Sequence, residues 1–203
     1  MTRNRPRPNG MRAAIAAAAA RIMAEGGIDN FALAKRKAAR QLGASDAQSL
    51  PGNDEIEVEL RNYLDLYQAE VHPDRIRDLR RIALSMMQEL EEFSPYLTGP
   101  VLKGIAGPYS EIELQLFPDS SKDVEIFLLN RNIVFSSAEA RRFSGDRARS
   151  ISILELEWEG APVKLSLFDS RDERITLKTT QVGKVMERAG IPEVSALLSQ
   201  NGG

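Results

Sequence analysis

The sequence contains no cysteine, a single histidine (His72) and few aromatic residues, which make up 6% of its 203 residues. Disulfides, zinc–thiolate sites and thiol nucleophiles are therefore excluded, and one histidine supports neither a histidine-rich metal site nor a serine triad. No apolar run approaches the roughly 20 residues that a membrane-spanning helix needs. We therefore expect a soluble protein of the reducing cytoplasm, without a membrane segment.

An alanine-rich stretch near the start of the chain, Ala13–Ala20, follows several arginines and superficially resembles a signal peptide. The run is built from alanine rather than leucine. It also continues into Arg21, Ile22 and Met23 at helical spacing. An amphipathic helix is therefore the better interpretation of this stretch.

The net charge of −2 hides an uneven distribution of charge along the chain. Residues 1–50 carry nine Arg and Lys against three Asp and Glu, whereas residues 51–95 carry five against eleven. The low aromatic content favours the interpretation that the basic and acidic segments pack together or are simply solvated. The alternative is that the basic start binds nucleic acid. The candidate contacts for that role are Lys35, Arg36, Lys37 and Arg40.

The spacing of apolar residues predicts four helices between residues 11 and 95. Asp29 or Asn30 is expected to cap the second helix, and Gly43 to end it. Residues 1–10, which include three Arg and two Pro, are expected to form a disordered basic tail. The predicted helices are Met11–Gly26, Phe31–Leu42, Asp54–Glu70 and Pro73–Phe93.

After Ser94, strand-like runs replace the helical spacing, and Glu159–Pro162 is a predicted hairpin turn. We therefore expect an α+β fold, with a helical region followed by a small mixed-sheet domain over residues 96–203 and a domain break near residue 95. The predicted strands are Tyr96–Thr98, Glu111–Phe117, Ile151–Trp158 and Val163–Phe168. The helices predicted in this half are Ser121–Asn130, Thr180–Ala189 and a short one after Pro192.

The most specific segment runs from Leu97 to Phe117 and reads LTGPVLKGIAGPYSEIELQLF. Strand residues two apart share one face of a sheet, so Glu111 and Glu113 are expected to project together. Two neighbouring carboxylates can hold Mg²⁺, which prefers oxygen ligands. The plainer alternative is that Glu111 and Glu113 form the solvated face of an ordinary edge strand.

This segment resembles the signature of the nucleotidyltransferase superfamily, which includes DNA polymerase beta, poly(A) polymerases and aminoglycoside nucleotidyltransferases. In that family a strand ends in Gly-Ser, and a second Gly follows five residues after the first. A loop that often ends in Ser then leads to a strand that reads Asp-x-Asp. Here Gly99 and Gly104 take the glycine positions, and Ser110 takes the serine position. Glu111 and Glu113 take the positions of the paired acids.

The resemblance covers about residues 96–170 and implies a nucleotidyltransferase-like fold with Mg²⁺ and an NTP as cofactors of an active enzyme. Glu111 and Glu113 are then the implied metal ligands, and a third carboxylate on a later strand completes the site. The implied NTP-binding turn is shaped by glycine, which lets the backbone approach phosphates closely, and by a helix N-terminus, which attracts anions. The residues of this turn are Gly99, Pro100, Gly104 and Ser110.

Three positions depart from the family pattern. Pro100 replaces the serine and removes both a hydroxyl and an N–H that would bind phosphate, although proline suits the start of a helix. Glutamate replaces aspartate at both acid positions, which shifts each carboxylate by roughly 1 Å. Lys164 takes the position of the third carboxylate, where a cation would repel Mg²⁺. Other acids that could supply the third carboxylate are Glu155, Glu157, Asp123 and Glu125. Of these, Glu155 and Glu157 are better interpreted as the solvated face of their predicted strand.

Two functions follow from this comparison. The first is a nucleotidyltransferase-fold protein with a degraded metal site that acts as a nucleotide-binding or regulatory module, which Pro100 and Lys164 favour. The second is an active Mg²⁺-dependent enzyme that transfers a nucleoside monophosphate from an NTP to a hydroxyl of RNA, protein or a small molecule. Nucleic-acid binding by the basic helices is a third hypothesis. A P-loop ATPase is disfavoured because the sequence lacks the Gly-x-x-x-x-Gly-Lys-Ser/Thr pattern.

Overall fold

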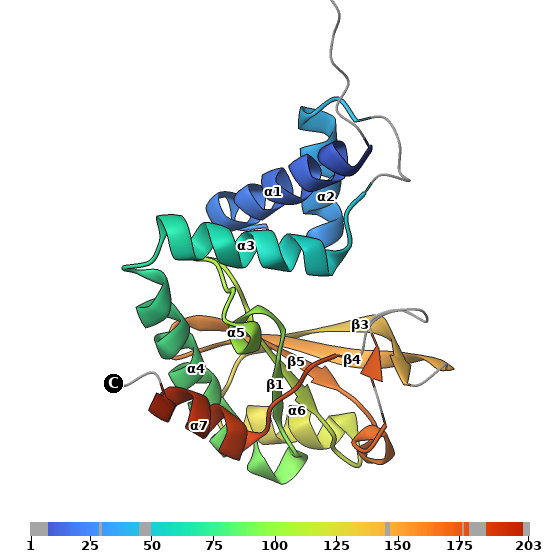
Figure 1. The fold of residues 1–203 in the computed structure, drawn as a ribbon. Helices are drawn as coiled ribbons and strands as arrows, with labels where there is room; N and C mark the ends of the chain where they lie inside the picture. Colours follow the sequence, from blue (N-terminus) through green and yellow to red (C-terminus); the bar gives the residue numbers. More distant parts are fainter. Residues whose placement is uncertain are drawn as a thin grey trace, which may run out of the picture. The chain divides into compact units, whose positions relative to one another are not determined.

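A computed structural model describes residues 8–28, 30–44, 50–144, 147–175, 177–178 and 186–200. The chain forms two compact units (Figure 1). The expected α+β fold, with helices preceding a mixed sheet, is confirmed. The expected domain break near residue 95 falls inside the second unit. The first unit comprises Met1–Arg75 with Ile105–Ser110, and the second comprises Ile76–Gly104 with Glu111–Gly203.

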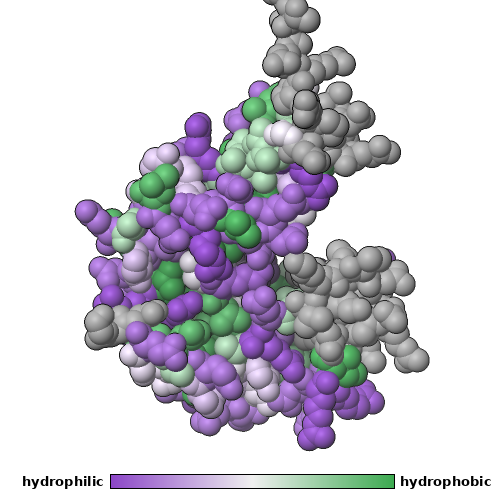
Figure 2. Space-filling model, viewed as in Figure 1, coloured by the Kyte–Doolittle hydropathy of each residue, from purple (hydrophilic) through white to green (hydrophobic). Residues whose placement is uncertain are grey.

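The first unit packs three helices around a core rich in alanine. The helices are α1 (Pro8–Gly26), α2 (Phe31–Gln41) and α3 (Asn53–Tyr67). Small side chains let the helices approach closely, and Ile105 from the second segment of the unit joins their core. Hydrophilic side chains predominate on the face of α3 that Figure 2 shows. Because α1 begins at Pro8, the expected tail is wrong for residues 8–10, while residues 1–7 lie outside the described ranges.

The ends of α2 follow the sequence prediction. Asn30 caps the helix by accepting a hydrogen bond from the Leu33 amide at 3.0 Å, while Asp29 lies outside the described residues. Gly43 follows the helix with a φ of +66°, a conformation that glycine adopts without strain. Between α1 and α3, Arg12 Nε donates to Glu55 Oε1 at 2.8 Å. This bond and a second from the Gly52 amide lower the pKa of Glu55 to about 2.

The next helix, α4 (His72–Glu89), is shorter than the predicted Pro73–Phe93. A separate 3₁₀ turn, η2 (Glu91–Phe93), follows it. Beyond Arg75, α4 belongs to the second unit, and its predicted apolar stripe is largely buried there. Ser85 of this helix accepts a hydrogen bond from Trp158 at 3.2 Å. No helix in the described part of the chain has the length and apolarity that a bilayer crossing requires.

The second unit is built on a six-stranded mixed sheet in the order β1-β2-β5-β4-β3-β6 (Figure 1). Strands β2 and β5 are parallel, and the other neighbours are antiparallel. The strands are β1 (Tyr96–Thr98), β2 (Ile112–Leu116), β3 (Phe135–Ser144), β4 (Arg147–Trp158), β5 (Ala161–Leu167) and β6 (Leu177–Lys178). The helices of this unit after α4 are α5 (Gly99–Lys103), α6 (Ser121–Asn130) and α7 (Ile191–Gln200). A further 3₁₀ turn, η3 (Ser170–Asp172), follows β5.

Strand register divides the side chains of the sheet between two faces, because successive residues of a strand point to opposite sides. Residues such as Leu114, Leu154 and Leu165 lie on one face and are fully buried. We call the other face the Lys164 face, since its register partners surround Lys164. On this face two rows of register partners cross the sheet from β1 through β2 and β5 to β4. One row runs Thr98, Glu113, Lys164 and Glu155. The other row runs Tyr96, Gln115, Ser166 and Ile153.

Two parts of the second unit differ from the sequence prediction. The long strand β3 was not expected, and it pairs along its whole length with β4. The predicted helix Thr180–Ala189 is wrong for its described end, because Met186–Arg188 have no regular structure and Ala189 forms an isolated bridge to Leu97. Residues 180–185 of that prediction lie outside the described ranges.

Candidate functional site

The turn that was expected to bind phosphate connects β1 to β2 through α5. Pro100 lies in the first turn of α5, where the missing N–H is tolerated. Gly104 ends the helix with a φ of +70° and donates its N–H to the carbonyls of Pro100 and Val101. A helix of five residues is thus held between a proline and a glycine, as the spacing of the sequence indicated.

Arg80 of α4 stabilises the C-terminal end of α5, a role that sequence reasoning missed. Arg80 is 7% exposed, and its guanidinium donates to the carbonyl oxygens of Val101 at 3.2 Å and Leu102 at 2.8 Å. Burial lowers the pKa of Arg80 from its ordinary value. The sequence signal was a single basic residue inside the apolar stripe of the helix.

Glu113 lies directly against the first glycine of the turn. Gly99 has a φ of +70°, and a Cβ atom added there would lie 2.8 Å from Glu113 Cδ and 2.9 Å from its Oε2. A larger residue at this position would require the Glu113 carboxylate to shift, and it would be strained by the positive φ. The structure therefore brings together Gly99 and Glu113, two of the residues that the resemblance assigned to one site.

Lys164 is the register partner of Glu113 across the parallel pair β2–β5. Its Nζ lies 3.5 Å from Glu111 Oε2 and 3.8 Å from Glu155 Oε1. The lysine side chain is 30% exposed, and the two glutamates are 42% and 49% exposed, so these ion pairs are only partly screened from water. We call Lys164, Glu111, Glu113 and Glu155 the Lys164 cluster.

The donor set of this cluster does not fit a two-metal nucleotidyltransferase site. Such a site needs three carboxylates converging on the ions, but here an ammonium group stands beside Glu111 and Glu155, where a divalent cation would be repelled. Within the described ranges, no three His, Cys, Asp or Glu side chains are arranged to hold a metal ion. Glu155 lies on the same face as Lys164 and contacts it, whereas Asp123 of α6 lines a pocket with Phe93 and Phe127.

Ser110 belongs to the segment Ile105–Ser110 of the first unit. It is buried, and its hydroxyl accepts a hydrogen bond from the Gly107 amide at 2.8 Å. This contact closes the tight turn that precedes β2. The described hydrogen bond gives Ser110 a local role in the turn, and the phosphate-binding role that the resemblance implies stays a prediction.

The four basic residues of α2 divide between two environments. Ala34 and Ala38 form the buried side of the helix. Lys35 is half-buried near Asp54 and Glu55, and its pKa is lowered from the ordinary value because burial outweighs the attraction of these carboxylates. The other three are exposed, and we call them the α2 basic face: Arg36, Lys37 and Arg40.

The geometry thus places an acidic, lysine-containing cluster beside a glycine turn on one face of a mixed sheet. Comparison with known proteins adds no relative to this description, since neither a protein-family model nor a curated protein matches the chain. The resemblance to nucleotidyltransferases therefore stays a prediction from the residues of this chain alone.

Proposed function

We propose that this protein is a nucleotidyltransferase-like binding module that regulates by binding and does not transfer nucleotides. The observation that carries the proposal is the position of Lys164, in register with Glu113 and with its ammonium 3.5 Å from Glu111. At this position the family resemblance implies a metal-binding carboxylate. An ammonium there neutralises part of the acidic cluster without any metal.

The charge of the cluster further supports a role without triphosphate chemistry. Three glutamates and one lysine leave the cluster with a formal charge of −2, which repels the phosphates of an NTP unless a metal is bound between them. Pro100 removes an N–H that the family turn offers to phosphate. Both features favour a ligand that carries little negative charge.

An active Mg²⁺-dependent nucleotidyltransferase is the second candidate, and one observation favours it. The Glu113 carboxylate lies against Gly99, so a strand acid and the glycine turn do face each other as the family site requires. We rank this candidate lower because it leaves the ammonium of Lys164 unexplained.

The test is transfer of radiolabelled nucleotide. We expect that the wild-type protein, incubated with Mg²⁺, labelled NTPs and total cellular RNA or protein, incorporates no more label than Glu113→Ala. Equally, Mg²⁺ with NTP should not raise the melting temperature. Incorporation that disappears in Glu113→Ala would overturn the proposal and establish the second candidate.

Nucleic acid is a further partner that we propose on the basis of charge. The exposure of the α2 basic face supports this role, since phosphate contacts are made mostly by exposed Arg and Lys. The lack of cysteine supports a cytoplasmic location, where both nucleic acid and nucleotides are available.

A further inference from the structure

Gln115 is a polar side chain buried on the Lys164 face, and only its amide nitrogen is hydrogen-bonded to a described residue. It is 1% exposed, and its amide nitrogen donates to Met186 Sδ at 3.7 Å. Its amide oxygen has no hydrogen-bond partner among the described residues. A thioether is a weak acceptor, and a buried carbonyl oxygen left without a donor is destabilising. Burial of this amide is therefore poorly compensated in the structure as it stands.

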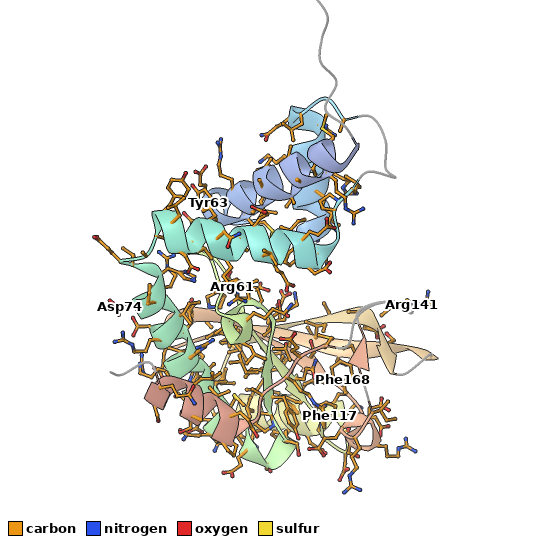
Figure 3. All side chains as sticks on the ribbon, viewed as in Figure 1. Arg61, Tyr63, Asp74, Phe117, Arg141 and Phe168 are labelled. Atoms are coloured by element: carbon orange, nitrogen blue, oxygen red, sulfur yellow. The ribbon has the colours of Figure 1, made fainter. Side chains whose placement is uncertain are left out.

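Aromatic and apolar side chains surround this amide. The rings of Phe117 and Phe168 stack with centroids 5.6 Å apart, and Figure 3 labels both beside the sheet. Tyr96, the register partner of Gln115, meets Phe117 edge to face at 5.7 Å. Met186 packs against this cluster and is half-buried. A planar ring that replaced the Met186 side chain would thus meet aromatic side chains on the same side of the sheet.

A second buried polar group without a partner lies in the same place. The guanidinium of Arg188 lies over the rings of Tyr96 at 4.5 Å and Phe117 at 5.3 Å. One of its terminal nitrogens donates to the carbonyl of Glu173, but the other is buried and has no partner among the described residues. This region therefore holds one acceptor and one donor that no described residue satisfies.

The segment that carries Met186 and Arg188 is attached to the sheet at one point close by. Ala189 and Leu97 exchange two backbone hydrogen bonds, of 2.8 and 3.0 Å, at the free edge of β1. Met186 lies three residues before this attachment, and its unbranched side chain adapts readily to a change of neighbours. The Met186 side chain can leave the aromatic cluster while the attachment at Ala189 stays intact.

We propose that Met186 occupies the place of a ligand, and that this ligand is an adenine-type base bound by Gln115. A carboxamide offers a donor and an acceptor side by side, and adenine presents the complementary pair, its 6-amino group and an adjacent ring nitrogen. The base takes the place of the Met186 side chain and packs against the aromatic cluster that includes Phe117 and Tyr96. Arg188 donates its free N–H to a second ring nitrogen or to the ribose.

The charge next to Gln115 selects the form of the ligand, and this step rests on the proposed function. Gln115 is two residues from Glu113, about 7 Å along the strand, so the phosphates of a bound nucleotide would reach the Lys164 cluster. Without a metal, the net charge of that cluster disfavours a triphosphate. The ligand is therefore a nucleoside rather than an NTP.

Calorimetric titration with four probes tests this inference: adenosine, purine riboside, AMP and ATP, all without Mg²⁺. Purine riboside lacks the 6-amino donor, so we expect it to bind at least tenfold more weakly than adenosine. ATP should bind more weakly than adenosine. Met186→Ala, which removes the competing side chain, should bind adenosine at least fivefold more tightly.

Gln115→Leu should lose adenosine binding by tenfold or more, whereas Gln88→Leu on the exposed side of α4 should leave it unchanged. Because leucine leaves no unpaired amide, Gln115→Leu should also unfold at the same or a higher temperature, and Gln115→Met serves as a second variant if it does not fold. Equal affinity for adenosine and purine riboside would overturn the inference, as would failure of both the wild type and Met186→Ala to bind adenosine. The proposed function is tested separately, by nucleotide transfer.

Discussion

Replacing Lys164 with aspartate should convert the Lys164 cluster into a metal site. The substitution changes the formal charge of the cluster from −2 to −4, and it puts a carboxylate where the ammonium now lies 3.5 Å from Glu111 and 3.8 Å from Glu155. Two unit charges about 4 Å apart in water interact by about 1 kcal/mol, so a doubly charged ion gains about 4 kcal/mol from this change. Screening in 0.1 M salt, with a Debye length of about 10 Å, reduces the gain to about 2.7 kcal/mol.

That gain corresponds to roughly 100-fold in affinity for Mg²⁺. Because the aspartate side chain is shorter than that of lysine, we expect an increase in affinity of at least about tenfold. Calorimetric titration with Mg²⁺ measures it. Lys164→Met separates removal of the cation from addition of a carboxylate and should give a smaller gain. Lys122→Asp, an equal change of charge on the exposed surface of α6, is the matched control. The reasoning is refuted if Lys164→Asp binds Mg²⁺ no more tightly than Lys122→Asp.

Three further predictions concern other parts of the chain. Because hydrogen bonds from Arg12 and Gly52 lower the pKa of Glu55 from its ordinary 4.5 to about 2, ionised Glu55 stabilises the fold above pH 4.5. This stability should be lost as the pH falls from about 4.5 to about 2, and melting curves of Arg12→Met should show a weaker loss over that range. Alanine at either Gly99 or Gly160 costs about 1–2 kcal/mol because both have positive φ, but only at Gly99 does the new Cβ also meet Glu113. Gly99→Ala should therefore melt at a lower temperature than Gly160→Ala, and the two should become equal in a Glu113→Ala background. Finally, affinity for single-stranded RNA should fall steeply with salt, and replacing the α2 basic face with glutamine should reduce that salt dependence; a salt-independent interaction would contradict this role.

Strongly local signals allowed much of the fold to be predicted from the sequence. The spans of β1 and α6 agree with the prediction, as does the cap of α2 by Asn30. The predicted turn at Glu159–Pro162 is a tight hairpin in which Glu159 and Gly160 both have positive φ. In each case residues close in sequence decide the structure, through hydrogen bonds or backbone preferences that need no distant partner.

The parts that were missed depend on distant contacts. Strand β3 exposes most of its first half, including Ser136–Glu139, so no apolar alternation marks it, and its conformation follows from pairing with β4. The sequence around Met186 has the spacing of a helix. Its contacts with the aromatic cluster and the pairing of Ala189 with Leu97 favour a non-helical backbone instead.

In the candidate site, too, some features could be predicted from local sequence and others depend on distant contacts. Spacing predicted that Glu111 and Glu113 project together from one strand, whereas β2 begins at Ile112 and it is Lys164 that contacts Glu111 and is in register with Glu113. The partners of Lys164 could not be chosen from sequence, because Glu155 and Glu157 lie on the same strand with the same parity. The pairing of β4 with β5 brings Glu155, rather than Glu157, opposite the lysine.

The central claim is that the ammonium of Lys164 takes the place of a metal ion among the three glutamates. Crystals of the wild-type protein soaked in millimolar Mn²⁺, with anomalous data collected, test it most directly. We predict no anomalous peak within coordination distance of Glu111, Glu113 or Glu155, and a peak there in Lys164→Asp. A fully occupied Mn²⁺ ion bound to Glu111 and Glu113 of the wild type, with Lys164 turned away, would contradict the account.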